Sequence, residues 1–179
     1  IIGLGYLQIV KANTKAKVIA VDISDIRLKT AQKVGADVVI NGKKEDPVQK
    51  IKKLTGEHYV RYQEKTAGSC DISIDCAGIP LTLGQCFEVL RPENGTVIIA
   101  SIFEDSFTVD PNMIVLKYMQ VLGSMGYYES ETREALDLIA GMKVDRDILI
   151  SHRYPLAEAA EAFKTQGNAN KSIKVMITD

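Results

Sequence analysis

Residues 1–22 read IIGLGYLQIVKANTKAKVIAVD, and this stretch decides the fold. Gly3 opens a helical pattern, and an apolar run after that pattern ends at Asp22. A glycine at the start of a helix, followed about twenty residues later by a carboxylate at the end of a buried strand, is the second half of the dinucleotide-binding fingerprint. The first half needs two earlier glycines and a strand before them, so we expect a strand to precede Ile1.

Short β-branched runs alternate with helical patterns along the chain, which is typical of βαβ units and a parallel sheet. The pattern predicts strands at 17–22, 37–40, 71–75, 96–101, 119–123 and 173–177. It predicts helices at 4–13, between Ser24 and Gly35, and at 47–54, 81–90, 111–117, 130–141 and 155–165, with an exposed loop at 55–69. The sheet is expected to be doubly wound, as in a Rossmann-like α/β domain.

We expect this domain to occupy residues 1–150 and to lack its first strand, with a separate C-terminal segment at 151–179. The boundary is placed near residues 147–151, where the parallel alternation is expected to end. The missing strand would lie between the strands at 17–22 and 71–75 and pair with both. Without it, backbone groups would be left unpaired in the core, so the folded protein is expected to contain upstream residues or a strand from another copy.

The composition is that of an ordinary globular domain, with 46% hydrophobic and 25% charged residues in 179 and a net charge of −1. Near-neutral charge argues against nucleic acid as a partner. The apolar runs are too short to span a membrane, and a secretory signal pattern is absent from the sequence given. Three cysteines without a C-x-x-C pair indicate neither a disulfide framework nor a zinc knuckle, so we expect a reduced, cytoplasmic setting.

Two positions carry the strongest signals for nucleotide chemistry. A carboxylate at Asp22 can accept both hydroxyls of an adenosine ribose and repels a 2′-phosphate, although it could instead be a solvated turn acid. Cys76, Ala77 and Gly78 follow a predicted strand where the chain can turn over a nucleotide, or they form only a tight turn. Asp75 before them is expected to order that turn.

The two histidines, His58 and His152, stand apart from other ligand types. Neither lies three or four residues from a further candidate ligand, so a metal site made by this chain alone is not expected. The spacing supports no Ser-His-Asp or Cys-His arrangement either.

Several segments together resemble the zinc-containing medium-chain dehydrogenase/reductase family, which includes alcohol, sorbitol, threonine and butanediol dehydrogenases. The resemblance is closest to the polyol and threonine branch and covers nearly the whole chain. It rests on IIGLGYLQIVKA, VIAVDISDIRLKTAQKVGADVVIN, CDISIDCAG, NGTVIIASIFED, VDPNMIVLKYMQVLGSMGYY, EALDLIAGMKVD, ISHRYPLAEAAEAFK and NKSIKVMI.

The resemblance implies a set of residues that contact NAD. Gly3 matches the third fingerprint glycine, Asp22 the ribose acid and Arg27 the basic residue beside that ribose. The remaining implied contacts fall into three groups: Ile23, Ala77 and Gly78 around the adenosine; the backbone of Ile99, Ala100, Ser101, Ser124 and Gly126 at the nicotinamide carboxamide; and Lys174 near the pyrophosphate.

The resemblance also implies the activity of the parent enzyme. Hydride would pass between a secondary alcohol or polyol and NAD, with zinc and the substrate held by an N-terminal, GroES-like domain outside this chain. Residues 151–179 would return to that domain, and the loop from Glu57 to Ala67 is longer than the usual connection. A dimer or tetramer of identical chains is expected, and the oxidoreductase would be cytoplasmic, with no membrane or nucleic-acid partner.

Two other functions share some of these sequence features. A nucleotide-sensing module without chemistry would carry the same cofactor residues. A methyltransferase also places an acid after its second strand, but it would need an antiparallel final strand in the sheet and would give GSMGYY no role.

The cysteine and histidine spacing predicts that this chain holds no stoichiometric zinc. Three cysteines and two histidines do not form a tetrahedral set by spacing. Metal analysis after dialysis tests this. One tightly held zinc per chain would contradict the interpretation of Cys70, Cys76, Cys86 and His58.

Overall fold

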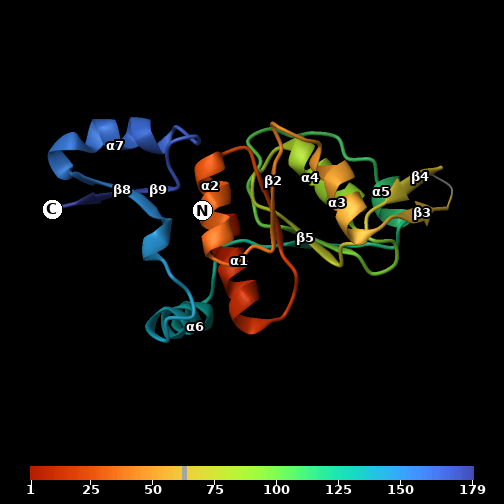
Figure 1. The fold of residues 1–179 in the computed structure, drawn as a ribbon, viewed down its shortest axis with the longest axis horizontal. Coiled ribbons are helices and arrows are strands. Elements are labelled where there is room, and N and C mark those ends of the chain that lie inside the picture. Colours follow the sequence, from red (N-terminus) through yellow and green to blue (C-terminus); the bar gives the residue numbers. More distant parts are fainter. Residues whose placement is uncertain (62–63) are drawn as a thin grey trace. The chain divides into compact units, whose positions relative to one another are not determined.

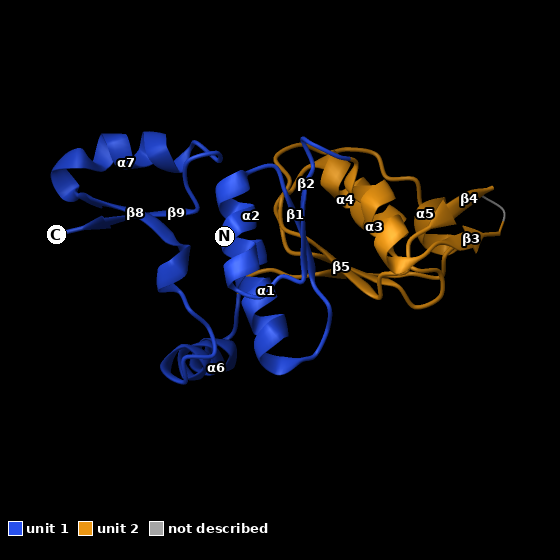
Figure 2. Ribbon diagram, viewed as in Figure 1, with its two compact units in different colours: residues 1–45, 127–179 blue, residues 46–126 orange. Residues whose placement is uncertain are grey.

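The computed structural model describes residues 1–61 and 64–179, which divide into two units (Figures 1 and 2). Unit 1 comprises residues 1–45 and 127–179, and unit 2 comprises residues 46–126. Unit 1 contains α1 (Ile2–Asn13), β1 (Ile19–Asp22), α2 (Asp25–Lys33), β2 (Val38–Asn41), α6 (Glu129–Ala140), β8 (Ile150–Pro155), α7 (Ala159–Gln166) and β9 (Lys174–Thr178). Unit 2 contains α3 (Pro47–Thr55), β3 (His58–Val60), β4 (Lys65–Ala67), β5 (Ile72–Asp75), α4 (Pro80–Val89), β6 (Thr96–Ile99), α5 (Asn112–Val115) and β7 (Gln120–Gly123).

Unit 1 is built from two parallel strand pairs, β1 with β2 and β8 with β9. Each pair is joined through a helix, α2 or α7, because parallel neighbours need a crossover connection. Gly35 follows α2 with φ of +107°, the left-handed conformation expected for a residue that ends a helix. The core of the unit contains Leu4, Leu7, Ala31, Leu149 and Ile173.

Unit 2 has a parallel sheet in the order β5-β6-β7. Asp46 caps α3 by accepting hydrogen bonds from the backbone N–H groups of Val48 and Gln49 at 2.8 and 3.2 Å, and Pro47 occupies the first turn. Helix α4 crosses from β5 to β6 and packs against α3. The core of the unit contains Leu83, Phe87, Leu90, Val97 and Met119.

The α/β class and its parallel strands are confirmed, but two local predictions were wrong. The expected loop at 55–69 contains an antiparallel hairpin of β3 and β4, in which Val60 and Ala67 are buried. Residues 62 and 63 of that loop lie outside the described part of the chain. Strand β8 was not expected, and because it pairs in parallel with β9, the parallel alternation continues past residue 150. The domain division at residue 150 stays a prediction.

Among the described residues, β1 and β5 each pair with a neighbouring strand along one edge only. Strand β1 pairs only with β2, and β5 pairs only with β6. This pattern is compatible with the expected additional strand, which stays a prediction. In the same described ranges, no helix is both long and apolar enough to cross a membrane.

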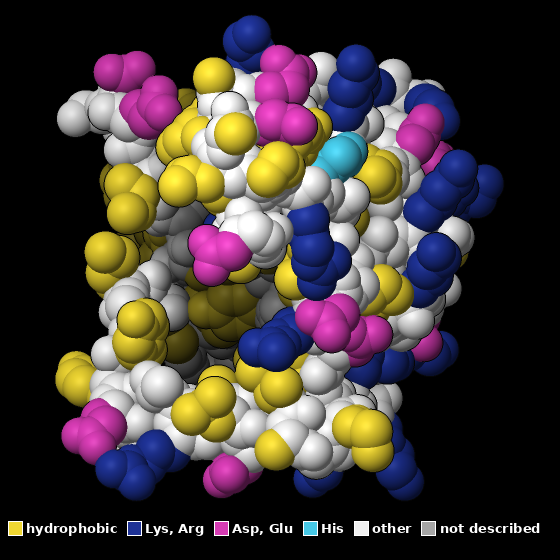
Figure 3. Space-filling view, turned by 90° about the vertical axis from the view of Figure 1, so that its left-hand side faces the viewer, with side chains coloured by type: hydrophobic (Ala, Val, Ile, Leu, Met, Phe, Trp, Pro, Cys, Tyr) yellow, Lys and Arg dark blue, Asp and Glu magenta, His cyan; other side chains and the backbone are white. Residues whose placement is uncertain are grey.

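The C-terminal segment exposes large apolar side chains. Leu156 and Phe163 are 70% and 73% exposed. Figure 3 is turned toward the side of Figure 1 where α7, β8 and β9 lie, and hydrophobic side chains are visible at the surface there.

Lys117 is a buried cation in unit 2, 3% exposed, whose Nζ donates a hydrogen bond to the carbonyl of Phe87. Burial, and then the charge of Lys52, lowers the pKa of Lys117 from 10.5 to about 8. The folded chain therefore loses this proton before the unfolded chain does. The destabilising effect of the charge is full below pH 8 and fades as the pH rises toward 10.5.

Replacing Lys117 by Met should therefore favour folding more at pH 7 than at pH 10, relative to the unmutated chain. Urea unfolding of both proteins at several pH values measures this difference. Burial raises the pKa of the Cys76 and Cys86 thiols, which acts in the opposite direction above pH 9, but this contribution is common to both proteins and cancels. A difference that does not change with pH would contradict the prediction.

Candidate functional site

Three parallel strands of unit 2 end at one level. The register pairs Asp75 of β5 with Ile99 of β6, and Ile99 with Gly123 of β7. Ligands of open α/β sheets bind outside the carboxyl ends of the strands. The register therefore brings the residues just after these ends, 76–78, 100–101 and 124–126, to the edge where a ligand is expected.

Asp75 organises this edge. The side chain is 2% exposed and accepts hydrogen bonds from the backbone N–H of Gly78 at 3.1 Å and from Thr82 Oγ1 at 2.6 Å. Ser101 Oγ donates a third hydrogen bond to the same carboxylate. A buried carboxylate is tolerated when donors surround it. The prediction that Asp75 orders the turn is confirmed, and Thr82 is a partner that sequence reasoning missed.

Gly78 takes a conformation and a space that suit only glycine. Its φ is +72°, and a Cβ at this position would lie 2.5 Å from the carbonyl oxygen of Ile102. The backbone after β5 therefore passes directly against the backbone after β6. The chain here can turn tightly, with Ala77 exposed at the surface of the turn.

Backbone hydrogen bonds also join the strand ends. The N–H of Ser124 donates to the carbonyl of Ile99 at 2.9 Å, and the N–H of Ala100 donates to the carbonyl of Asp75 at 2.9 Å. These two expected contact positions therefore also hold the edge together, while Ser124 and Gly126 are exposed. Contact of these backbones with a carboxamide stays a prediction.

Asp22 closes β1 in unit 1 and faces a cation. Its Oδ1 accepts a hydrogen bond from the backbone N–H of Ser24 at 2.9 Å, and its Oδ2 lies 3.9 Å from the guanidinium Nη1 of Arg27. The Asp22 and Arg27 side chains are 30% and 25% exposed. Asp25, three residues further on, accepts hydrogen bonds from Lys44 at 3.0 Å and from Asn41 at 2.7 Å, and these hydrogen bonds lower its pKa.

Arg27 also connects this site to the C-terminal segment. Its Nε donates to the carbonyl of Ser172 at 3.4 Å, two residues before Lys174 in β9. Ser172 is fully buried and was not predicted as a site residue, and no local pattern marks it. Ile23, expected beside the adenine, is 50% exposed and therefore accessible to a ligand.

Gly3 lies in the first turn of α1, as expected. This helix has twelve residues, no acidic side chain in its first turn and no side-chain cap on its first N–H groups. The positive end of a helix in this state favours an anionic group, such as a phosphate. Contact of Gly3 with a pyrophosphate and of Asp22 with a ribose stays a prediction.

The thiols and histidines do not assemble a metal site in the described ranges, where no group of three His, Cys, Asp or Glu side chains could hold a metal ion. Burial, and then the charge of Asp75, raises the pKa of Cys76 to about 11 and that of Cys86 to about 12. Burial raises the pKa of Cys70 as well. Protonated thiols are poor nucleophiles and poor ligands. Cys70 and Cys86 pack against the core of unit 2.

Comparison with known proteins identifies the family of this architecture. Residues 2–141 match the model of a family described as zinc-binding dehydrogenase. The chain belongs to this family. The match confirms the resemblance described above, and the parallel pairing of β7 with β6 removes the methyltransferase alternative.

Individual relatives agree with the family. L-threonine 3-dehydrogenase of Thermococcus kodakarensis is 30% identical over 98% of the chain and 47% of the relative. Human sorbitol dehydrogenase is 26% identical over 92% of the chain and 43% of the relative. A zinc-binding dehydrogenase structure from Sinorhizobium meliloti, bound to NADP, matches with a TM-score of 0.81 and 25% identity over 100% of the chain and 50% of its own.

The chain thus spans about half the length of the curated relatives that it matches.

Gly78→Ala is predicted to destabilise the fold by at least about 1–2 kcal/mol, from the positive φ alone. The close approach to Ile102 adds to this cost. Gly84→Ala in α4 is the matched control, because its Cβ would meet nothing within 4 Å and should stabilise the helix by about 0.5–1 kcal/mol. Urea unfolding measures both, and equal effects of the two substitutions would refute the role given to Gly78.

Proposed function

We propose that this chain is the cofactor-binding part of an NAD-dependent, zinc-containing alcohol or polyol dehydrogenase. The observation that carries the proposal is Asp22, a partly exposed carboxylate at the end of β1 with Arg27 beside it. Family membership supports the reaction class, and the names of the relatives, threonine and sorbitol dehydrogenases, support an alcohol or polyol substrate with a secondary hydroxyl.

Each part of the chain would bind one part of the cofactor. Asp22 would accept hydrogen bonds from the ribose hydroxyls, because its carboxylate is held by Ser24 and Arg27 and still reaches solvent. The first turn of α1 at Gly3 would receive the pyrophosphate, and Lys174 adds a positive charge for the same group. The carboxyl edge of β5, β6 and β7 would orient the nicotinamide, which accepts hydride from the alcohol when bound.

Asp22 also supports the choice of NAD over NADP. A 2′-phosphate would stand against a carboxylate of like charge, and Arg27 is already engaged with that carboxylate and with Ser172. Asp25 differs from Asp22 in its position, because it lies in the first turn of α2 and binds Asn41 and Lys44.

Other properties of the full enzyme belong to the same proposal. Zinc and the substrate pocket would come from a further domain, to which residues 151–179 would return. The exposed Leu156 and Phe163 in that segment support such a contact. We also propose a cytoplasmic enzyme and a dimer or tetramer of identical chains.

Replacing Asp22 by Gly should weaken NAD binding by about 1–3 kcal/mol, since charge-assisted hydrogen bonds to the ribose are lost. The discrimination against NADP should fall at the same time. Asp25→Asn, the adjacent acid, is the control and should leave the NAD/NADP ratio unchanged. The measurements are cofactor titration of the chain and kcat/KM with each cofactor in the full-length enzyme.

The unmutated protein itself provides a decisive comparison. Equal or better use of NADP than of NAD would refute the assignment of Asp22. Absence of any NAD-linked oxidation of secondary alcohols or polyols by the full-length protein would refute the proposed activity and leave a nucleotide-sensing role.

A further inference from the structure

Unit 2 contains a cavity that the proposed cofactor site does not use. Its volume is about 490 Å³, within the range of small-molecule pockets. It is lined by the hairpin β3–β4, the end of α4 and the segment around α5. Lys117 precedes β7 and Phe87 precedes β6, so the cavity lies toward the amino ends of these strands. The cofactor edge lies at their carboxyl ends.

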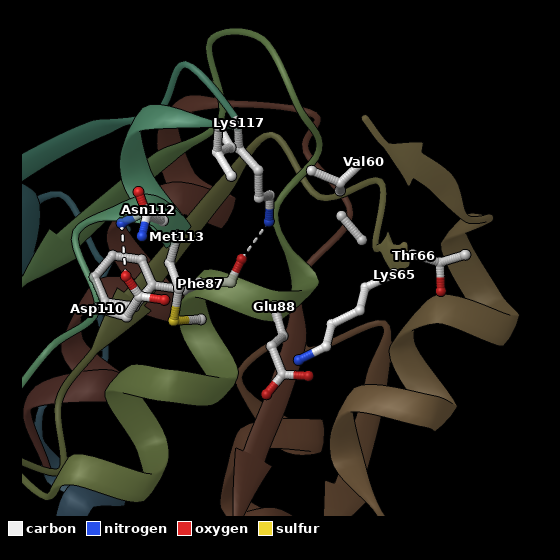
Figure 4. Close-up of a pocket in the computed structure, with 11 residues that line it drawn as sticks. Val60, Lys65, Thr66, Phe87, Glu88, Asp110, Asn112, Met113 and Lys117 are labelled. Atoms are coloured by element: carbon white, nitrogen blue, oxygen red, sulfur yellow. Dashed lines mark hydrogen bonds between the residues drawn. The ribbon is translucent and has the colours of Figure 1, made fainter. Parts of the chain in front are cut away.

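The cavity is lined by a buried ammonium group. Figure 4 shows the Lys117 side chain reaching down between Val60 and Phe87, with its hydrogen bond to the Phe87 carbonyl. An ammonium group has three N–H donors, and this hydrogen bond uses one of them. The two remaining donors belong to a side chain that is 3% exposed.

A second buried cation contacts a residue that lines the cavity, Thr66. Lys52 of α3 is 6% exposed, and its Nζ donates to the carbonyl of Thr66 at 2.7 Å. Neither lysine forms an ion pair with a carboxylate of the described residues. The charge of Lys52 lowers the pKa of Lys117, and the charge of the exposed Glu88 raises it. Two buried positive charges that contact only carbonyl groups create a local demand for an anion.

The rest of the lining restricts what this anion can be. Val60, Phe87 and Met113 offer apolar walls, while the acidic side chains Glu88 and Asp110 are exposed. Asp110 accepts a hydrogen bond from the backbone N–H of Asn112 at 2.9 Å. These two acids repel anions, and they repel a dianion more strongly than a monoanion. The apolar walls favour a ligand that has a hydrocarbon part.

We propose that this cavity binds a small organic carboxylate, whose oxygens accept hydrogen bonds from Lys117 and whose apolar part lies against Val60, Phe87 and Met113. The carboxylate would give Lys117 a negatively charged hydrogen-bond partner beside the Phe87 carbonyl. The site is separate from the residues assigned to the cofactor and does not depend on the proposed dehydrogenase activity.

Isothermal titration of the chain at pH 7 with three probes tests this proposal. Benzoate has both the charge and the apolar ring, benzamide has the ring without the charge, and inorganic phosphate has the charge without the ring. Benzoate should bind at least tenfold more tightly than either of the others. Benzamide or phosphate binding as tightly as benzoate, or benzoate giving no saturable binding, would overturn the proposal.

Two lysine variants locate the site. Lys117→Met should weaken benzoate binding at least tenfold, whereas Lys53→Met, which removes an exposed lysine of the neighbouring helix α3, should leave it unchanged. Unchanged binding to Lys117→Met would contradict the assignment.

Amide NMR of the unmutated chain decides the question if the Lys117→Met variant does not fold. Benzoate should shift the amide signals of Thr66, Phe87 and Met113. Shifts confined to Gly78 and Ser124, at the carboxyl edge of the strands, would place the ligand elsewhere and refute the cavity site.

Discussion

The carboxyl edge of unit 2 depends on one buried carboxylate. Asp75 receives donors from the turn after β5, from α4 and from the end of β6. In a low-dielectric interior such hydrogen bonds are strong, and a missing donor is costly. The same contacts require glycine at position 78, because the backbone after β6 passes within 2.5 Å of where a Cβ would be. The shape of this edge therefore follows from electrostatics as much as from packing.

Unit 1 also has a carboxylate at a strand end that is held by nearby donors, but this carboxylate is partly exposed. Asp22 is held at β1 by a backbone N–H and faces Arg27, which in turn reaches the backbone before β9. Asp25, three residues on, is compensated by Lys44. Two acids so close in sequence thus have different electrostatic surroundings. Only Asp22 lies at the end of β1, the position of the ribose acid in dinucleotide-binding folds.

The fold was predictable where the pattern is repeated and local. The β-branched runs at Ile19–Asp22 and Thr96–Ile99, and the spacing from Gly3 to Asp22, predict strands and a nucleotide site from sequence alone. The hairpin β3–β4 was missed because its strands have three residues each and only Val60 and Ala67 are buried. Strand β8 was missed because ISHRYP mixes polar residues on both faces and ends in proline.

The missed parts of the site share a physical reason. Thr82 of α4 donates to Asp75 at the end of β5, and Ser172 meets Arg27 over a separation of 145 residues. Neither contact leaves a periodic trace, because each depends on how elements pack after they have formed. The burial of Lys117 could not be predicted for the same reason. Lysines are mostly exposed in proteins, so a lysine beside a predicted strand is expected at the surface.

Because its three thiols are protonated, local unfolding of this chain can be followed by the rate at which its cysteines are chemically modified. Alkylating reagents react with the thiolate, and burial raises the pKa of Cys70, Cys76 and Cys86, which lowers the small thiolate fraction present at neutral pH. Opening of unit 2 would return each thiol to its ordinary acidity and expose it to reagent. The rate at which each of the three cysteines is alkylated would then report how often unit 2 opens around that residue. The protein would need no engineered cysteine for this measurement.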